Sequence, residues 1–338
     1  MSATGQYATF SDLYTGLQNA VRVSTGVTAT ENQAKRAINI ALQDMHLGFD
    51  YKFPWAERSA ILLTHAQYST GTVTISQGST SLAGSSTLWN TANVFSVNNM
   101  RANGKIRIAG SIAPYTVSAI SSDTAATLSS KYTESDASAQ TYVYYEDEYD
   151  LASDFLRPVD MQRFSPESHI DLLSRTEMRR RYPSNSTPGT PVVSVIIDSA
   201  PSGNTTPIRR VRLYPPPSTA LRIPYSYITS NLVVSSAGAA QSQFSADTDE
   251  PIIPLRYRHA LFFHALYNWY RDKKDDSRAQ EVKNEYTDIM LRITSDAEVG
   301  GVRPRIQPRI GPYAARARRP WSGGARRYDT NGKFDRME

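Results

Sequence analysis

The chain has 338 residues, of which 40% are hydrophobic and 20% charged, a composition typical of one or two globular domains. It contains no cysteine, which excludes disulfide bridges, thiolate metal sites and a cysteine nucleophile. The net charge of +5 is unevenly placed. Residues 301–338 carry ten basic and three acidic side chains, a net of +7, which leaves −2 for the rest, so the basic character belongs to a tail and not to a folded face.

The first residues, 1–7, are polar and lack the basic and apolar regions of a secretory signal. No apolar run approaches the roughly 20 residues that a membrane helix needs. We therefore expect a soluble protein that is made in the cytoplasm and has no membrane partner.

The N-terminal part of the chain has the apolar spacing of two amphipathic helices. The first is predicted over 9–23, where Thr9 can cap its start. The second is predicted over 30–47, where Thr30 and Gln33 fit a capping box. Because the two apolar stripes are close in sequence, we expect the helices to pack together as a hairpin.

Residues 59–149 change to a side-chain period of about two, which is typical of strands. Clusters of Gly, Ser and Asn separate the alternating runs. Helical segments flank this region on both sides, so the pattern predicts a small β-barrel or sandwich inserted into a helical domain. The clearest predicted strands are 72–75, 105–108, 115–117 and 142–145.

The next region mixes both patterns. A short helix is predicted over 168–181. Strands at 210–214 and 221–227 flank a proline-rich segment, 215–218, where we predict a hairpin-like turn because proline cannot continue a ladder. Residues 235–249 are rich in Ala, Ser and Gly, which favours a flexible loop.

Two further helices are predicted near the C-terminal end of the folded part. The first covers 254–271 and has a wide apolar face. The second follows a capping box of Ser277 and Gln280 and continues to at least Ile293. Four helices of this kind suffice for a bundle.

Together these patterns predict an α+β fold: an antiparallel helical bundle core with an inserted all-β domain, a β-hairpin and an extended C-terminal tail. The predicted domains are a helical hairpin at 1–58, the inserted β domain at 59–149, the hairpin and C-terminal helices at 150–300, and the basic tail at 301–338.

The order of short motifs along residues 8–300 points to a known family. The motifs are A-x-x-x-I-N-x-A-L-Q-D (34–44), Phe53-Pro54-Trp55, Glu148-Tyr149-Asp150-Leu151 with Asp154-Phe155, R-L-Y-P-P-P (212–217), Y-R-H-A-L (257–261) and K-K-D-D (273–276). In this series the chain resembles the head-to-tail adaptor proteins of tailed phages, especially the tail tubular proteins A of short-tailed phages. The segment 78–89 also resembles a β-module of several phage virion proteins.

The resemblance implies a structural virion protein that is not an enzyme. In such adaptors about twelve copies typically form a ring beneath the portal protein, and the C-terminal segment docks on the portal. A tail or nozzle protein binds below, and the phage DNA passes through the ring. The implied location is the neck of the virion, after assembly in the host cytoplasm.

The tail contains arginines interleaved with apolar anchors, and this pattern favours docking on the portal over binding DNA. A DNA-binding tail, whose affinity would fall steeply with salt, stays open as an alternative, as does an unstructured solubilising end. The candidate docking residues are Arg303, Arg305, Ile306, Arg309, Ile310, Tyr313, Arg316, Arg318, Arg319, Trp321, Arg326, Arg327 and Tyr328.

A second alternative is a receptor- or glycan-binding protein that acts through the β insertion, because Trp89, Tyr115 and Tyr132 could stack on sugar rings if exposed. We expect them instead to pack the insertion or to touch a neighbouring subunit.

The sequence shows no catalytic motif. The sequence has neither a nucleotide-binding loop nor a Gly-x-Ser-x-Gly elbow. The five histidines lack the spacing of a zinc helix, and the acidic pair Asp275-Asp276 fits a solvated helix junction. Asp147-Glu148 is a further acidic pair that could be proposed for acid–base chemistry. We expect no catalytic residue, no metal and no cofactor.

Overall fold

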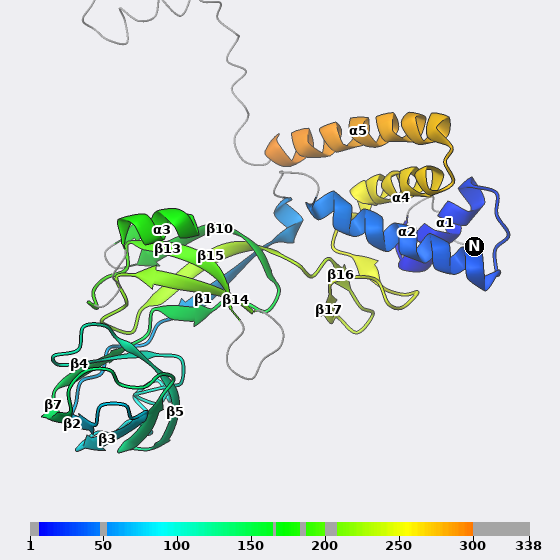
Figure 1. Cartoon of the computed structure of the whole chain (residues 1–338). Helices are drawn as coiled ribbons and strands as arrows, with labels where there is room; N and C mark the ends of the chain where they lie inside the picture. Colours follow the sequence, from blue (N-terminus) through cyan, green and yellow to red (C-terminus); the bar gives the residue numbers. More distant parts are fainter. Residues whose placement is uncertain (1–6, 48–52, 165–166, 183–186, 200–207, 300–338) are drawn as a thin grey trace, which may run out of the picture. The chain divides into compact units, whose positions relative to one another are not determined.

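The computed structural model describes residues 7–47, 53–164, 167–182, 187–199 and 208–299 (Figure 1). The chain divides into two compact units, one formed by residues up to 51 and from 255 on, the other by residues 52–254. The helices are α1 (Phe10–Ala20), α2 (Thr28–Leu47), α3 (Arg175–Arg181), α4 (Arg258–Asp272) and α5 (Asp276–Val299), with short 3-10 turns at Pro54–Ala56 and Leu255–Tyr257. Within the described ranges, none of these helices is long and apolar enough to cross a membrane.

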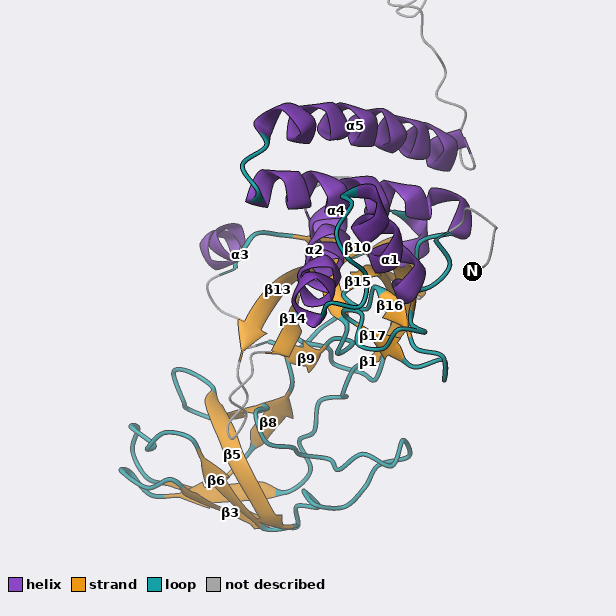
Figure 2. Ribbon diagram, turned by 90° about the vertical axis from the view of Figure 1, so that its right-hand side faces the viewer, coloured by secondary structure: helices purple, strands orange, loops and turns teal. Residues whose placement is uncertain are grey.

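The described strands, orange in Figure 2, all belong to the second unit. They form four sheets. They are β1 (Glu57–Leu63), β2 (Thr72–Ile75), β3 (Ser81–Ser85), β4 (Lys105–Ile108), β5 (Tyr115–Ser122), β6 (Ala125–Leu128), β7 (Ala137–Gln140), β8 (Tyr142–Tyr145), β9 (Glu148–Asp150), β10 (Phe155–Phe164), β11 (Glu167–His169), β12 (Asp171–Leu172), β13 (Val193–Ser199), β14 (Ile208–Tyr214), β15 (Arg222–Thr229), β16 (Val233–Val234), β17 (Ala240–Gln241) and β18 (Glu250–Pro251).

Helix α1 starts where its sequence predicts. The hydroxyl of Thr9 accepts a hydrogen bond from the backbone N–H of Asp12, and the Asp12 carboxylate accepts one from the Thr9 N–H. The predicted capping box of α2 is wrong: the helix begins at Thr28, two residues earlier, and the Thr30 hydroxyl donates instead to the carbonyl of Val27 at 2.9 Å.

Near the C-terminal helices, two hydrogen bonds bear on the motifs found in the sequence. The buried Arg258 side chain donates to the carbonyl of Ala8, just ahead of α1, so the Y-R-H-A-L motif joins the start of α4 to the start of α1. The carboxylate of Asp275 accepts a hydrogen bond from the Arg278 N–H at 3.3 Å. Helix α5 therefore begins at Asp276 and is capped by Asp275, and the predicted box of Ser277 and Gln280 is wrong.

The seven-stranded sheet has the order β7-β2-β3-β6-β5-β4-β8 and curls around a core of its own. The alternation in the sequence predicted β2, β4 and β8 at the bounds that the structure has. Trp89 is fully buried in this core, where its indole N–H donates to the Tyr142 hydroxyl at 2.8 Å. The chain enters and leaves the sheet side by side, because Tyr68 pairs with Tyr144 through hydrogen bonds of 2.8 and 2.9 Å.

Two four-stranded sheets, β1-β15-β10-β11 and β12-β13-β14-β9, share a second core. Strand β1 precedes the seven-stranded sheet in sequence, whereas all the other strands of the two sheets follow it. Leu62 of β1 contributes to the shared core with Tyr149 of β9, Val211 of β14 and Ile223 of β15. This core therefore brings together the chain segments on either side of the seven-stranded sheet.

Asp154 and Phe155, which belong to a motif of the resemblance, hold the start of β10 against β15. The Asp154 carboxylate accepts hydrogen bonds from the hydroxyls of Tyr227, at 2.8 Å, and Thr229, at 2.6 Å. The ring of Phe155 stacks on that of Tyr227 with centroids 5.5 Å apart.

The hairpin predicted around the three prolines is wrong. Strands β14 and β15 flank residues 215–218 but lie in different sheets, β14 between β13 and β9 and β15 between β1 and β10. The proline segment is thus a crossover between sheets. The predicted flexible loop at 235–249 contains β17, which pairs with β16, and a turn in which the Asp249 carboxylate accepts from the N–H groups of Ser245 and Ala246.

The predicted helix over 168–181 is shorter than expected. Helix α3 begins at Arg175, where the Ser174 hydroxyl accepts from the Glu177 N–H, and strands β11 and β12 occupy the preceding residues.

The predicted fold class, with a helical bundle as the core, is contradicted. The protein has a β-rich α+β fold in which five described helices accompany a curled seven-stranded sheet and three smaller sheets. The prediction gave too much weight to the apolar stripes of the helices. Large aromatic side chains such as Trp89, Tyr144 and Tyr145 are buried among strands instead.

Candidate functional site

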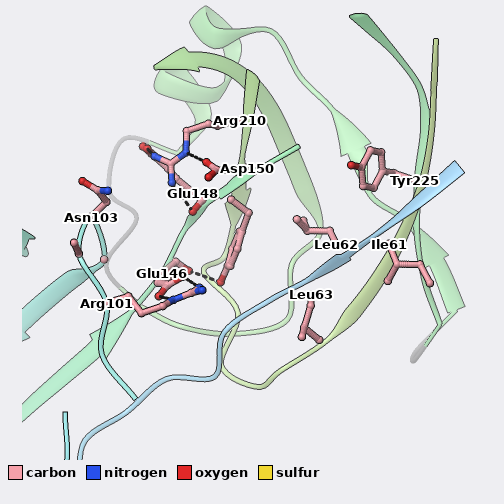
Figure 3. Close-up of a pocket in the computed structure, with 13 residues that line it drawn as sticks. Ile61, Leu62, Leu63, Arg101, Asn103, Glu146, Glu148, Asp150, Arg210 and Tyr225 are labelled. Carbon is pink, nitrogen blue, oxygen red and sulfur yellow. Dashed lines mark hydrogen bonds and ion pairs between the residues drawn. The ribbon is translucent and has the colours of Figure 1, made fainter. Parts of the chain in front are cut away.

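A cavity of about 390 Å³ lies in the second unit, beside β1 and β9 (Figure 3). Three consecutive residues of β1, Ile61–Leu63, form one side of it. The loop 101–104, Glu146 and residues 148–150 form the other, with Arg210 and Tyr225 completing the lining. Charged side chains dominate the side opposite β1, as Figure 3 shows. The cavity is the clearest candidate site among the described residues.

The first charged group joins the loop at Arg101 to the end of β8. The Arg101 guanidinium donates two hydrogen bonds to the Glu146 carboxylate, and the bond from Nε to Oε1 measures 2.8 Å. The Tyr144 hydroxyl, fully buried, lies 2.7 Å from Glu146 Oε1 and accepts a hydrogen bond from the Arg101 backbone N–H. Burial, and next the negative charge of Glu146, raise the pKa of Tyr144 well above its ordinary value, so the hydroxyl stays protonated.

Asp147 is the most deeply buried acid of the group, with 1% of its side chain exposed. Its Oδ2 atom accepts a hydrogen bond from Lys105 Nζ at 2.5 Å, and Arg212 Nε lies 3.7 Å from the same oxygen. Two cations thus offset the cost of burying this carboxylate.

Glu148 lies between two arginines of β14. Arg210 Nη1 donates to Oε2 at 3.0 Å, and Arg212 Nε donates to Oε1 at 3.0 Å. Burial alone would raise the pKa of Glu148, but the hydrogen bond and charge of Arg212, with the charges of Lys105 and Arg210, hold it below its ordinary value. The carboxylate is therefore ionised and held in place near neutral pH.

The strand register produces these pairs. Strands β9 and β14 are antiparallel, and their register places Glu148 opposite Arg212 and Asp150 opposite Arg210. Opposite charges at directly facing positions stabilise a strand pair. Tyr149 alternates with the acids, and so its ring enters the core while its hydroxyl donates to the Glu146 carbonyl at 3.1 Å.

The β1 side of the cavity is apolar. Ile61 and Leu63 are 52% and 44% exposed, although each is flanked in sequence by Leu62, which is buried. Beyond them the backbone N–H of His65 donates to the Tyr149 hydroxyl at 3.1 Å. The chain just beyond β1 is thus tied to β9, while the C-terminal half of β1 presents two apolar side chains to solvent.

The paired charges of the cavity suit a structural or binding role. Each carboxylate in the cavity is paired with a cation, and in the parts of the chain that the structure describes, no three His, Asp or Glu side chains gather as metal ligands. The acidic pair Asp147-Glu148 consists of two carboxylates with separate basic partners. Neither is available as an unpaired acid or base.

The aromatic residues considered for glycan binding are 9% exposed or less and pack the core of the seven-stranded sheet. Sugar stacking by Trp89, Tyr115 and Tyr132 is therefore contradicted, and the packing expectation is confirmed. The portal-docking residues predicted at 303–328 all lie outside the described residues. The charged cavity was not predicted. The signal that could have found it is the alternation of acids at 146, 148 and 150 and of bases at 210 and 212, which is the pattern of two facing strands.

Comparison with known protein families identifies the chain. Residues 136–308 match the model of one family, SU10 adaptor protein. The match covers half of the chain, from the end of the curled sheet through the cavity residues of β9 and β14 to the beginning of the tail. The protein is therefore a phage adaptor, a structural protein of the virion type. It belongs to the SU10 adaptor protein family.

The more specific resemblance to tail tubular proteins A is not confirmed. No curated protein matches the chain.

Proposed function

We propose that this protein is a head-to-tail adaptor whose copies, about twelve in number, form a ring beneath the portal of the phage head. The ring links the capsid to a tail or nozzle protein and lines the channel through which DNA leaves. Its place is the neck of the virion, after assembly in the host cytoplasm. Membership of the adaptor family is the observation that supports this proposal.

The uneven charge of the chain supports it further. A DNA channel must let the polyanion pass, and residues 1–300 carry a net charge near −2, which gives no strong general attraction for phosphates. The basic residues gather in residues 301–338, where apolar and aromatic side chains alternate with arginines. Such anchors contribute most of the affinity at protein interfaces, so we assign portal docking to this tail.

Deletion of residues 302–338 tests the proposal. The truncated chain should fold, since the described core lies before residue 300, but should no longer join portal-bearing heads. Assembly is measured as infectious particles after complementation of a phage that lacks the gene. A truncated chain that completes such particles would refute the docking role.

Binding of DNA by the tail is the competing outcome. A gel shift at low and high salt distinguishes it, because a tail that binds through phosphates loses affinity steeply as salt rises. Tight, salt-sensitive binding of DNA that is lost with residues 302–338 would favour that alternative.

A further inference from the structure

Strand β1 is an edge strand with one open side. It pairs with β15 along its whole length, and among the described strands nothing pairs with its other side. The register places Ile61 opposite Pro224, which has no N–H. Since hydrogen-bonded and non-hydrogen-bonded pairs alternate in an antiparallel ladder, Leu62 bonds to β15 and Ile61 points its N–H and C=O away from it.

Two further hydrogen bonds agree with this assignment. Thr64 lies two residues after Leu62, so its backbone groups point the same way, and its N–H donates to the Leu221 carbonyl at 2.9 Å, on the β15 side. His65 lies four residues after Ile61, and its N–H donates to the Tyr149 hydroxyl on the other side. The outward peptide groups of Ser59, Ile61 and Leu63 therefore form an open hydrogen-bonding edge, and two exposed apolar side chains accompany it.

The cavity follows this edge. Ile61–Leu63 line it directly, and the opposite lining carries three carboxylates and two guanidinium groups, those of Glu146, Glu148, Asp150, Arg101 and Arg210. Asp150 is the most accessible of these acids, with 58% of its side chain exposed. An extended segment at the open edge would therefore have an apolar neighbour on one face and a mildly acidic neighbour on the other.

One segment of this chain has the matching pattern. Residues 302–310 read Val-Arg-Pro-Arg-Ile-Gln-Pro-Arg-Ile, with apolar residues at every even position and polar or basic residues at every odd one. This period of two is that of a strand. Both prolines, Pro304 and Pro308, fall on even positions, so a strand whose odd residues bond to β1 would place both missing N–H groups on its outer side, where proline is tolerated.

We propose that residues 302–310 of one copy add as an edge strand to β1 of a second copy. In a parallel arrangement the even residues lie beside Ile61 and Leu63, and the arginines face the carboxylates of the cavity. Open strand edges commonly recruit extended segments in this way, with the main chain providing affinity and alternate side chains providing specificity.

We assign the donated strand to a second copy because the contact then links each subunit to the next. A strand donated by one subunit to the edge of the next is a heterologous contact, and repeated contacts of this kind close into a ring. The inference thus rests on the proposed ring and deepens it. It divides the docking residues of the tail: Arg303 to Ile310 join neighbouring copies, and Tyr313 to Tyr328 reach the portal.

A labelled peptide of residues 301–312, added to the full-length chain, tests the contact without the portal. Fluorescence anisotropy should show saturable binding, weakened at least tenfold by the double change Ile61→Lys and Leu63→Lys. The matched control is Leu172→Lys, which changes another exposed apolar residue of an edge strand, 48% exposed on β12. Equal weakening by the control, or no binding to the wild-type chain, would overturn the proposal.

A second peptide separates strand addition from simple charge attraction. It exchanges Pro308 and Arg309, which keeps composition and charge but moves a proline to a position that must donate to β1. We expect at least a tenfold loss of affinity, and equal binding of the two peptides would contradict the proposal.

Cross-linking shows whether the added strand comes from the same chain or from a second copy. Introduced cysteines report this cleanly, since the chain has no cysteine of its own. A full-length chain with Leu63→Cys, mixed with a tagged full-length chain with Ile306→Cys, should form a mixed disulfide, and Leu172→Cys should not. A disulfide that forms only when both changes are in one chain would overturn the second-copy assignment. The proposed function fails on particle assembly instead, so the two failures are distinguishable.

Discussion

Arg212 and Glu148 face each other across β14 and β9, with the guanidinium Nε 3.0 Å from the carboxylate Oε1. They are 64 residues apart in sequence. Their pairing joins the strand that leaves the curled sheet to the strand that precedes the proline crossover. The pair therefore stabilises the contact between β9 and β14.

This pair makes stability depend on pH on the acid side. The pKa of Glu148 is lower in the folded chain than its ordinary value of 4.5. The stabilisation is therefore present above pH 4.5 and is lost as the pH falls through the lower, folded-state pKa.

Glu148→Gln should reduce the free energy of unfolding at pH 7 by about 1–3 kcal/mol, less than for a fully buried pair because Arg212 is 36% exposed. The difference from wild type should shrink between pH 5 and 3, as measured by urea denaturation. Glu281→Gln, at an exposed position of α5, is the control. A pH-independent difference would contradict the ion-pair explanation.

Gly104→Ala should disrupt the loop beside the cavity. A β-carbon at Gly104 would overlap the ring and hydroxyl of the fully buried Tyr144. We expect a loss of about 1–3 kcal/mol in the free energy of unfolding, as for other overpacked cores. Gly189→Ala, where the nearest atom is 3.3 Å from the added carbon, should cost clearly less in the same thermal or urea measurement.

Asp154→Asn should lower the pKa of Tyr227. Burial, followed by the hydrogen bond and charge of Asp154, raises that pKa from 10.0 to about 12. The associated stability is present below pH 10 and is lost as the pH rises toward 12. Titration of the Tyr227 ring by NMR, assigned with Tyr227→Phe, should show a value nearer 10 in the variant, whereas Asp160→Asn should leave it unchanged.

Trp321→Ala should weaken docking on the portal by about 2 kcal/mol, roughly 30-fold, if this tryptophan is an anchor of the interface. Affinity is measured with isolated portal and full-length chain. Phe334→Ala is the matched control, since it removes another aromatic ring of the same tail outside the predicted docking residues. Equal losses would show that the anchors were misassigned.

Local sequence signals predicted local features well. Alternating residues defined β2, β4 and β8, and Thr9 marked the start of α1, because a strand's side-chain period and a helix cap depend on neighbours within a few residues. The proline run showed correctly that β14 ends there. It could not show which sheet the next strand joins, since that depends on partners such as β1, about 160 residues away in sequence.

The candidate site shows the same division. The cavity joins Ile61, Arg101, Glu148 and Arg210, four segments that the sequence keeps far apart. The alternation of acids and bases hinted at facing strands, but only the register puts Glu148 opposite Arg212. The helical bundle was over-predicted because amphipathic stripes identify helices without revealing how much of the protein's interior the helices form.

The pairing of Tyr68 with Tyr144 has an evolutionary consequence. Because the chain enters and leaves the curled sheet at adjacent points, and this sheet has its own buried tryptophan core, the whole excursion behaves as an exchangeable cassette. Related chains could shorten, enlarge or replace it while β1, β9 and their neighbours kept their places, provided that the cations of Arg101 and Lys105 beside Glu146 and Asp147 were kept or replaced. Lineages could thus vary what the cassette presents to its surroundings without rerouting the backbone beneath it.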